Sequence, residues 1–550
     1  MVGLRRAAPD NPAGGWLTVL ASQLKHNSMD SPLLQRALIS VSDKLGLVDF
    51  ARGLATAGVQ IFSTGGTGRY LEEHGITVHD VAEYTGFPEM MDGRLKTLHP
   101  KVFGGILCRH DRPDDMAALV EHQIERFDLI VVNLYPFEET VARNEVTPSE
   151  AIEQIDIGGP SLVRAAAKNH SFVTIATHPE QYSAILEQLD AQGGTTLEMR
   201  RRLAGDAFTC TAQYDQAISD YFNRLESTDR FPTTFQKSFR RKSILRYGEN
   251  PHQQAALYSD APPSGANLVS SRKLHGKELS YNNLLDLDSA LVIARSLPLP
   301  GVVVVKHNNP CGAASGSSLV EATKKALAGD PVSAFGSILG FNQAVDAAVA
   351  DHLSTPGLFV EAIVAPNFEP AALEILTSKP KWKNNVRLVQ VGTVSNNSHQ
   401  SECRFIAGGV LVQDANDQPD DESQWNIVTE ISPDDEQLQD LRFAWSVVRH
   451  VKSNAIVLVR QQSIVGAGAG QMSRVDAVEI AIRKAEERAS NSVLASDAFF
   501  PFPDSIEQAA QAGIAAIIQP GGSRRDPEVI DACNKHRLPM IFTNARHFKH

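Results

Sequence analysis

The chain has 550 residues, of which 42% are hydrophobic and 21% are charged, and its formal net charge is -12. This length suffices for about three or four domain-sized units, and the composition is that of an ordinary globular protein. The acidic balance argues against broad nucleic-acid binding, and no apolar run approaches the roughly 20 residues of a membrane span, so we expect neither a nucleic-acid nor a membrane partner.

Residues 1–36 differ from the rest of the chain. They include MVGLRRAAPDNPAGGWLTVLASQLKHNSMD, whose one apolar patch is short for a signal sequence and is followed by no clear cleavage site. We expect a disordered extension, or an upstream start with Met29 as a second initiator, and the use of this segment for targeting stays open.

From residue 37 onward, strand and helix patterns alternate. ALISV (37–41) predicts a strand, and Ser42-Asp43 offer a helix N-cap. An apolar helical face follows, formed by Leu47, Phe50, Ala51 and Leu54. Strand patterns recur in GVQIFST, FDLIVVNL and SFVTIAT, and SLVRAAAKNH predicts a helix. The alternation predicts an α/β domain over residues 37–180, with a parallel sheet covered on both faces.

The remaining chain divides into two further parts. Residues 181–237 have a mostly helical pattern and are expected to form a connector. Residues 238–550 form a second α/β region, with strand-rich blocks around 301–366 and 454–545. The acidic segment at 414–426 is expected to be an exposed loop.

Five cysteines are scattered along the chain and form no C-x-x-C pair. This pattern suits a reducing compartment such as the cytoplasm, and it provides neither a disulfide framework nor a zinc site. We therefore expect that no metal is required.

Several loops of the first region fall where a strand turns into a helix. Backbone N–H groups and the helix dipole favour anions at such turns. The turns contain Ser40, Ser42 and Lys44, then Ser63, Thr64 and Gly65, and later Asp156 before two glycines. Each turn alone is weak evidence, but three in one sheet favour a phosphorylated ligand.

Two basic segments lie near these turns in the sequence. MDGRLKTLHPKVFGG (91–105) contains Arg94, Lys96 and Thr97, and a solvated basic loop is its simplest interpretation. On the helix SLVRAAAKNH, Arg164 and Lys168 are four residues apart and share a face. The rest of that helix is small and apolar, which indicates close packing.

The stretch GVVVVKHNNPCGAASG (301–316) runs from a valine-rich strand into Lys306 and His307. Its apolar residues on both faces predict a strand covered on both sides, and we expect Pro310 to end its pairing. Catalytic groups gather at such strand ends in α/β folds, and a lysine next to a histidine can move protons. From this stretch alone, a structural strand end is the favoured interpretation.

Zinc-dependent nucleobase deamination can be excluded by spacing. That chemistry requires P-C-x-x-C, whereas Cys311 is followed by Gly312, Ala313 and Ala314. The second cysteine is therefore absent.

Further motifs complete the comparison with a known family. In order, the chain contains SVSDK, STGGT, TGFPEMMDGR, KTLHP, VVNLYPF, IDIGGP, RAAAKNH, LRYGENPHQ, LSYNN, VKHNNPCG, KSNAIV, GAGQMSR, SDAFFPF, QPGGS and RHFKH. These motifs resemble those of the bifunctional purine-biosynthesis enzymes, which join 5-aminoimidazole-4-carboxamide ribonucleotide (AICAR) transformylase to IMP cyclohydrolase. The resemblance runs from about residue 37 to residue 550, and it reverses the structural interpretation of Lys306 and His307.

The resemblance implies a fold, a reaction sequence and an assembly. It implies a methylglyoxal-synthase-like cyclohydrolase domain, followed by a transformylase of two deaminase-like α/β subdomains without zinc. The expected substrates are AICAR and the cosubstrate 10-formyltetrahydrofolate, which give the formamido nucleotide FAICAR and tetrahydrofolate. Ring closure of FAICAR then gives IMP. A homodimer with transformylase sites at the subunit interface is expected.

The resemblance also assigns residues to each site. The expected catalytic residues are Lys306, His307 and Asn454 in the transformylase and Tyr135, Asp156, Lys96 and Lys168 in the cyclohydrolase. In the transformylase, substrate binding is expected from Arg246, Tyr247, Glu361, Arg474, Phe499, Phe500, Arg546 and His550. In the cyclohydrolase it is expected from Ser40, Ser42, Lys44, Ser63, Thr64, Gly65, Arg94 and Thr97. An alternative keeps only the transformylase and makes the first domain a nucleotide-sensing module; Tyr135, Asp156 and Lys168 favour an enzyme.

Overall fold

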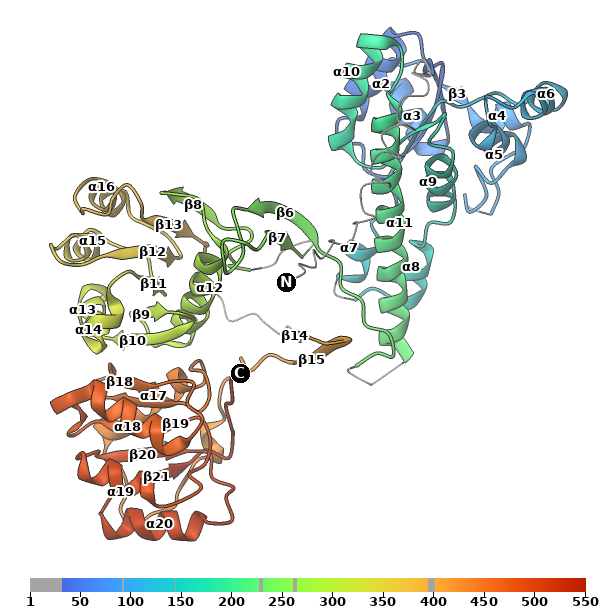
Figure 1. Cartoon of the computed structure of the whole chain (residues 1–550). Coiled ribbons are helices and arrows are strands. Elements are labelled where there is room, and N and C mark those ends of the chain that lie inside the picture. The colour runs from blue at the N-terminus through green and yellow to red at the C-terminus, as the bar shows by residue number, and fades with distance from the viewer. Residues whose placement is uncertain (1–31, 92, 144, 227–230, 261–264, 394–400) are drawn as a thin grey trace, which may run out of the picture. The chain divides into compact units, whose positions relative to one another are not determined.

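The computed structural model describes residues 32–91, 93–143, 145–226, 231–260, 265–393 and 401–550, and divides at 237/238 into two compact units (Figure 1). The extension expected over residues 1–36 lies outside these ranges except for its last five positions. Among the described residues, no helix is long and apolar enough to cross a bilayer.

The first unit is built on the predicted parallel sheet. Its strands lie in the order β3-β2-β1-β4-β5, and every pairing is parallel. The strands are β1 (Arg36–Ser40), β2 (Gln60–Ser63), β3 (His79–Asp80), β4 (Leu129–Val132) and β5 (Thr174–Ala176). All four residues of β4 are buried, so both faces of the central sheet are covered, which confirms the prediction.

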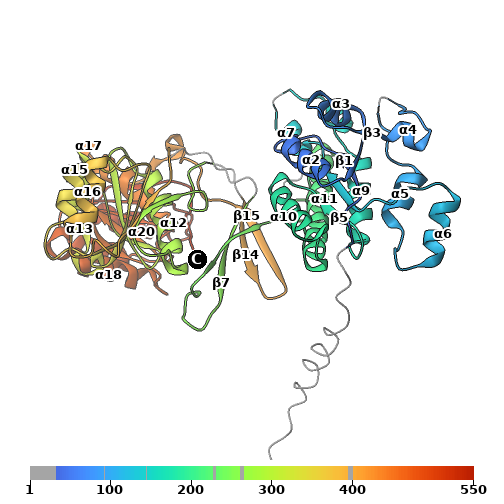
Figure 2. The ribbon, with the colours of Figure 1, turned by 90° about the horizontal axis from the view of Figure 1, so that it is seen from above.

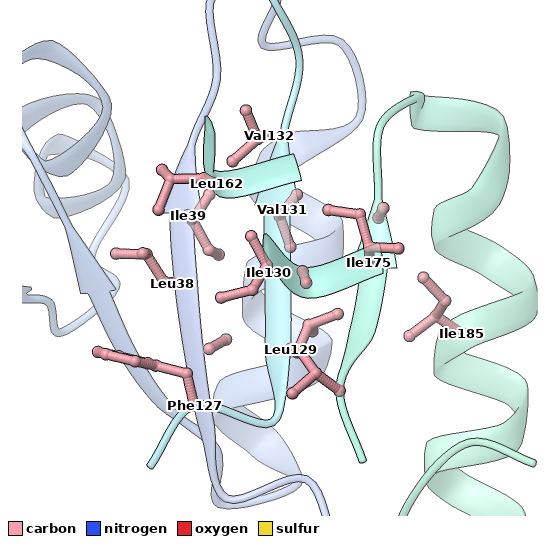
Figure 3. Close-up of a cluster of buried hydrophobic side chains, with 14 of the residues drawn as sticks. Leu38, Ile39, Phe127, Leu129, Ile130, Val131, Val132, Leu162, Ile175 and Ile185 are labelled. Carbon is pink, nitrogen blue, oxygen red and sulfur yellow. The ribbon is translucent and has the colours of Figure 1, made fainter. Parts of the chain in front are cut away.

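Ten α-helices and one 3-10 helix, η1 (Pro179–Gln181), of the first unit are described. The α-helices are α2 (Leu47–Thr56), α3 (Gly65–Glu73), α4 (Val81–Thr85), α5 (Pro100–Leu107), α6 (Pro113–Glu121), α7 (Phe137–Val141), α8 (Pro148–Glu153), α9 (Gly158–Lys168), α10 (Tyr182–Gln192) and α11 (Leu197–Glu226). The apolar core lies between the sheet and its helices; Figure 3 shows Leu162 of α9 and Ile185 of α10 against the strands.

The segment 181–237 is more than a linker. Its helices α10 and α11 supply Ile185, Leu189, Met199 and Leu203 to the core of the first unit. The expected helical content is present, but these helices complete the fold of the first unit.

The predicted N-cap of α2 is wrong. The helix begins at Leu47 after Gly46, whose φ of 67° is left-handed. Ser42 and Asp43 are held instead in a loop, because their N–H groups donate to the Asn133 side chain after β4. The buried face of α2 is the predicted one.

The second unit contains two six-stranded sheets, as expected from its two strand-rich blocks. The orders are β10-β9-β11-β12-β13-β8 and β16-β21-β20-β19-β17-β18. The first sheet has β8 (Arg272–His275), β9 (Gly301–Lys306), β10 (Asn309–Ser315), β11 (Ser337–Phe341), β12 (Val360–Ala365) and β13 (Arg387–Gln390). The second has β16 (Asn426–Ile427), β17 (Ile456–Val459), β18 (Ile464–Gly468), β19 (Val493–Ser496), β20 (Ala516–Gln519) and β21 (Met540–Phe542).

Helices cover both sheets. They are α12 (Tyr281–Ser296), α13 (Leu319–Gly329), α14 (Pro331–Ala334), α15 (Ala347–Leu353), α16 (Pro370–Ser378), α17 (Asp435–Val448), α18 (Arg474–Ala485), α19 (Asp504–Gln511) and α20 (Asp526–Lys535). The five residues before Lys306 are buried, which confirms the valine strand. The sheets meet where the Ser315 N–H donates to Gln462 O across 3.0 Å.

The expectation that Pro310 ends the pairing is wrong. Pro310 lies inside β10, which turns back along β9 after a two-residue turn at His307 and Asn308. The proline is tolerated because β10 is the terminal strand of its sheet and the register shifts between Pro310 and Gly312.

Two hairpins of the second unit carry many exposed residues. One pairs β6 (Arg240–Leu245) with β7 (Ala255–Ser259), and the other pairs β14 (Ser401–Ile406) with β15 (Gly409–Asp414). Both extend from the body of the unit (Figure 2). The acidic segment that follows β15 is mostly exposed, as predicted.

Candidate functional sites

Three loops meet at the carboxyl edge of the first sheet. The Asn133 amide oxygen accepts from the N–H of Ser42 at 2.5 Å and of Asp43 at 3.0 Å, joining the loop after β1 to that after β4. Thr67 at the start of α3 donates to Val41 O across 2.9 Å. The loops predicted at positions 40–44 and 63–67 are therefore brought together.

Lys96 lies over the first turn of α3. Thr64 is the N-cap position of this helix, and Gly65 follows it with a φ of 44°. A Cβ at Gly65 would stand 3.8 Å from Lys96 Nζ and 3.5 Å from a Glu89 carboxylate oxygen. Lys96 pairs with Glu89 at 3.0 Å. This corner combines a helix N-terminus with a lysine, which suits an anionic group.

Lys44 lies beside the same loops. Its Nζ donates to Val41 O across 3.0 Å and stands 5.7 Å from the centre of the Tyr70 ring. Burial lowers the pKa of the Lys44 ammonium, and the nearby Asp43 carboxylate opposes this.

Asp156 sits immediately before α9, next to the same corner. Its carboxylate accepts from the Gly159 N–H across 2.7 Å, and its own N–H donates to the Tyr214 hydroxyl across 2.7 Å. Burial raises the pKa of the Asp156 carboxyl, and the N–H groups of Gly159 and Gly158 and the charge of Lys96 oppose this rise. The raised pKa makes this carboxyl hold its proton more tightly than an exposed aspartate does, which suits a group that takes part in proton transfer.

Two neighbours frame this carboxyl. The Thr97 hydroxyl lies 3.2 Å from the position of a Cβ at Gly158, so it touches the first turn of α9. Tyr135 follows β4 and is 40% exposed. Burial raises the pKa of the neighbouring Tyr214 hydroxyl to about 12, and the proximity of Tyr135 adds to this rise. The structure thus gathers Lys96, Thr97, Tyr135 and Asp156 around one edge of the sheet.

Three other residues expected in the cyclohydrolase site of the first unit have different positions or partners. Lys168 is the last residue of α9, about 15 Å along the helix from its first residue at 1.5 Å per residue. The structure therefore does not bring Lys168 to Asp156. The Ser63 side chain is buried and donates to Ile39 O, so it braces the strand. Arg94 forms an ion pair with Glu153.

In the second unit, Lys306 closes β9 as predicted. Its Nζ donates to Gly336 O across 2.8 Å and to Phe335 O across 3.2 Å, at the start of β11. His307 and Asn308 follow with φ values of 53° and 61°, so the turn into β10 is left-handed at both positions. This is the geometry of a tight type I′ hairpin.

Asn454 is tied to this hairpin through the backbone before it. The Lys452 N–H donates to the Asn309 side chain across 3.0 Å, and Asn309 also donates to His307 O across 3.2 Å. Asn454 itself donates from its amide to Gln471 O across 2.8 Å. Lys306, His307 and Asn454 therefore belong to one neighbourhood, which is built from both sheets.

Arg474 does not stand free to clamp a phosphate. Its side chain is buried, forms an ion pair with the fully buried Asp497, and donates to Asn454 Oδ1 across 2.8 Å. Burial lowers the pKa of the guanidinium, and Asp497 opposes this. The geometry makes Arg474 a positioning residue for Asn454, which corrects the expected binding role.

The two phenylalanines after β19 differ. Phe500 is fully buried in the core around α18 and α19, so its expected contact with substrate is corrected to a packing role. Phe499 is 37% exposed and can line a pocket.

The last residues of the sequence are hydrogen-bonded to the segment before β17. Lys549 O accepts from the Ser453 N–H across 2.9 Å, and Lys549 Nζ donates to His450 O across 3.2 Å. Arg546 is exposed, and its guanidinium lies 4.4 Å from the centre of the Phe548 ring. His550 follows Phe548 by two positions. These contacts keep the chain end beside the segment that carries Asn454.

The remaining expected residues stand near ring or ion partners. Arg246 is exposed over the Tyr247 ring at 4.6 Å and donates to its hydroxyl across 2.8 Å. Glu361 on β12 forms an ion pair with Arg387 on β13. Within the described residues, no group of three or more His, Cys, Asp or Glu side chains is placed to hold a metal.

Sequence reasoning missed Asn133, Glu89, Tyr214 and Asp497. The position of Asn133 could have indicated a role, because it directly follows a buried parallel strand, and functional groups gather at such strand ends. Asp497 also follows a strand directly. Tyr214 lies 58 positions after Asp156 on a long helix, and no local pattern indicates this contact.

Comparisons with known proteins agree across nearly the whole chain. The family model described as AICARFT/IMPCHase bienzyme matches residues 166–484, and that of the MGS-like domain matches residues 46–161. Three proteins named "Bifunctional purine biosynthesis protein PurH" are similar to 94% of this chain. They come from Rhodopirellula baltica (62% identical, 99% of its length), Persephonella marina (50%, 100%) and Bacillus subtilis (46%, 100%).

Proposed function

Since this chain belongs to the family of bifunctional purine biosynthesis proteins, we propose that each of its two units carries one of the two activities. The chain is an AICAR transformylase and IMP cyclohydrolase. The first unit is proposed to close the ring, and the second to transfer the formyl group. The observation that carries this division is the placement of Lys96 and Asp156 in one unit and of Lys306, His307 and Asn454 in the other.

Formyl transfer is proposed at the β9–β10 hairpin, with 10-formyltetrahydrofolate as cosubstrate. The aromatic amine of AICAR attacks the formyl carbon, the bond from this carbon to folate N10 breaks, and N10 gains a proton. His307 removes the proton from the amine, and Lys306 supports the developing charge or delivers the proton to N10. Asn454 orients the intermediate, and its amide is fixed for this by Gln471 and Arg474.

The exposed aromatic and cationic residues are proposed to bind the nucleotide and folate. Arg246, Tyr247 and Arg546 offer charge and stacking for the phosphate and the heterocycle. Glu361, Phe499 and His550 are proposed to shape the pocket.

Ring closure is proposed at the carboxyl edge of the first sheet. The carboxamide nitrogen of FAICAR attacks the formyl carbon of the same molecule, and water leaves. The enzyme mainly holds the reactive rotamer and moves protons. Asp156, with its raised pKa, and Lys96 and Tyr135 are proposed for the proton transfers. The loops with Ser40, Ser42, Lys44, Thr64, Gly65, Arg94 and Thr97 are proposed to bind the nucleotide. Lys168 enters this proposal through the family resemblance alone.

A homodimer in the cytoplasm is proposed as the working form. Large apolar side chains stand exposed on both faces of the β14–β15 hairpin: Phe405, 86% exposed, pairs with Val410 on one face, and Leu411, 56% exposed, lies on the other. Exposed apolar side chains of this size commonly mark interfaces. All five cysteines are free thiols, which suits a reducing compartment.

A paired assay tests the division of activities. One reaction contains AICAR and 10-formyltetrahydrofolate, and both tetrahydrofolate and IMP are followed; a second contains FAICAR alone. We expect IMP in both. Lys306→Ala should abolish tetrahydrofolate release while ring closure of added FAICAR persists. Tetrahydrofolate release without enzymatic ring closure would instead favour a transformylase that carries a nucleotide-sensing module.

A further inference from the structure

The turn that presents His307 has a left-handed backbone at two consecutive residues, neither of which is glycine. His307 and Asn308 both have positive φ values, 53° and 61°. Residues with a Cβ seldom adopt this left-handed region, although asparagine and histidine do so more often than most. Strained turns of this kind persist only where surrounding contacts determine them, so the contacts of this turn matter.

One carboxylate on α12 supplies the central contact. The Asn308 N–H donates to Asp286 Oδ1 across 2.7 Å. The Asn308 amide faces the same turn of α12, where it lies 3.2 Å from Ser289 Oγ; with its nitrogen toward the helix it also donates to Leu285 O across 3.0 Å. The hairpin turn is thus anchored at its second residue, immediately after His307.

The helix that carries Asp286 is capped and packed against β9. The helix α12 starts with a capping box between Ser280 and Asn283. The neighbouring Leu287 is fully buried, in the same core as Val303 and Val305 of β9. Helix and strand therefore form one packed body, and a carboxylate on α12 can fix the end of β9 without moving itself.

We propose that Asp286 is a positioning residue for formyl transfer, which holds the His307–Asn308 turn left-handed so that the imidazole meets the amine of AICAR. This inference rests on the proposed role of His307. Asp286 accepts from the Asn308 backbone N–H and, with the amide nitrogen toward the helix, from the Asn308 side chain across 3.2 Å, so its contribution is to the geometry of the turn. Because a reacting group misplaced by about 1 Å can cost roughly a hundredfold in rate, a modest rearrangement of the turn would be visible in kcat.

The test compares Asp286→Ala, Asp286→Asn and His307→Ala in the full-length chain. The asparagine keeps an oxygen that can accept the Asn308 N–H, whereas the alanine does not. We expect Asp286→Ala to lower kcat for formyl transfer at least about tenfold with the KM for AICAR within about twofold, and Asp286→Asn to retain most of the rate. Ring closure of added FAICAR should be unchanged in both, and Glu374→Ala, at an exposed carboxylate of α16, should change neither reaction.

The outcomes separate this inference from the proposed site. If His307→Ala transfers formyl groups at the full rate, the site assignment fails. If His307→Ala is inactive but Asp286→Ala is fully active, only the positioning role fails. If Asp286→Asn loses as much transfer activity as Asp286→Ala while still closing FAICAR, the negative charge matters and the hydrogen-bond role is overturned. Thermal unfolding of each variant shows whether the second unit is folded, and if the alanine variant is not, Asp286→Asn decides.

Discussion

The side-chain oxygen of Asn309 accepts the backbone N–H of Lys452 across 3.0 Å, which joins the hairpin carrying Lys306 and His307 to the segment carrying Asn454. The same side chain donates to His307 O across 3.2 Å. One residue thus spans the two sheets of the second unit at the point where formyl transfer is proposed.

Removing this link should impair formyl transfer. Asn309→Ala deletes both hydrogen bonds, so the hairpin and Asn454 lose their shared support, and we expect kcat for transfer to fall by about tenfold to a hundredfold. Ring closure of added FAICAR should not change, because that site lies in the other unit. Asn384→Ala, at an exposed asparagine of the second unit, serves as the control. Full transfer activity in Asn309→Ala would show that the two halves hold their positions without it.

Asp156 should affect both ring closure and the pH dependence of the free energy of unfolding. Burial raises the pKa of this carboxyl above its ordinary value of 3.8. The folded chain therefore binds this proton more tightly than the unfolded chain does, so this group's contribution to the free energy of unfolding decreases as pH rises from the ordinary pKa through the folded pKa. Asp156→Asn keeps an oxygen for the Gly159 N–H but cannot ionise.

We expect this variant to lose ring closure by about a hundredfold or more, while formyl transfer persists. Urea unfolding of both proteins across the acidic to neutral range should show a shallower decline of stability with pH in Asp156→Asn. Parallel pH profiles for the two proteins would contradict the raised pKa.

Local pattern predicted the parts of the fold that depend on local burial. The four valines of 302–305 make a strand buried on both faces, and Leu47, Phe50, Ala51 and Leu54 form the buried face of α2, because period and side-chain type decide these features. The parallel sheet followed from the alternation of strands and helices.

Features that depend on residues far apart in the chain could not be predicted from local sequence patterns. Ser42 and Asp43 do not cap α2, because Asn133, some 90 positions later, takes their N–H groups. Pro310 continues a strand, because β10 is terminal in its sheet and bulges. Arg474 forms a buried ion pair with Asp497. Lys168 lies at the C-terminal end of α9, whereas Asp156 lies just before its N-terminal end. No local periodicity encodes such pairings.

The buried pair of Arg474 and Asp497 should be important for stability. Arg474→Met leaves the Asp497 carboxylate without its cation in a fully buried place, which costs about 3–5 kcal/mol in comparable cases. Arg442→Met removes the cation of a half-exposed pair with Glu422, and we expect a loss of at most about 1 kcal/mol. Urea unfolding of both variants measures the difference. Equal losses would mean that solvent or other groups already stabilise Asp497.

The exposed β14–β15 hairpin allows a test of the proposed homodimer. Phe405 is 86% exposed and lies opposite Val410 in the hairpin, with Ile406 and Leu411 also exposed. A carboxylate at position 405 would be strongly disfavoured in an apolar interface. We expect Phe405→Asp to shift the mass measured by light scattering from dimer to monomer and to lower formyl transfer, because the transformylase site is expected at the interface. Glu374→Ala, at an exposed carboxylate of α16, should leave both unchanged. A Phe405→Asp protein that stays dimeric and active would place the interface elsewhere.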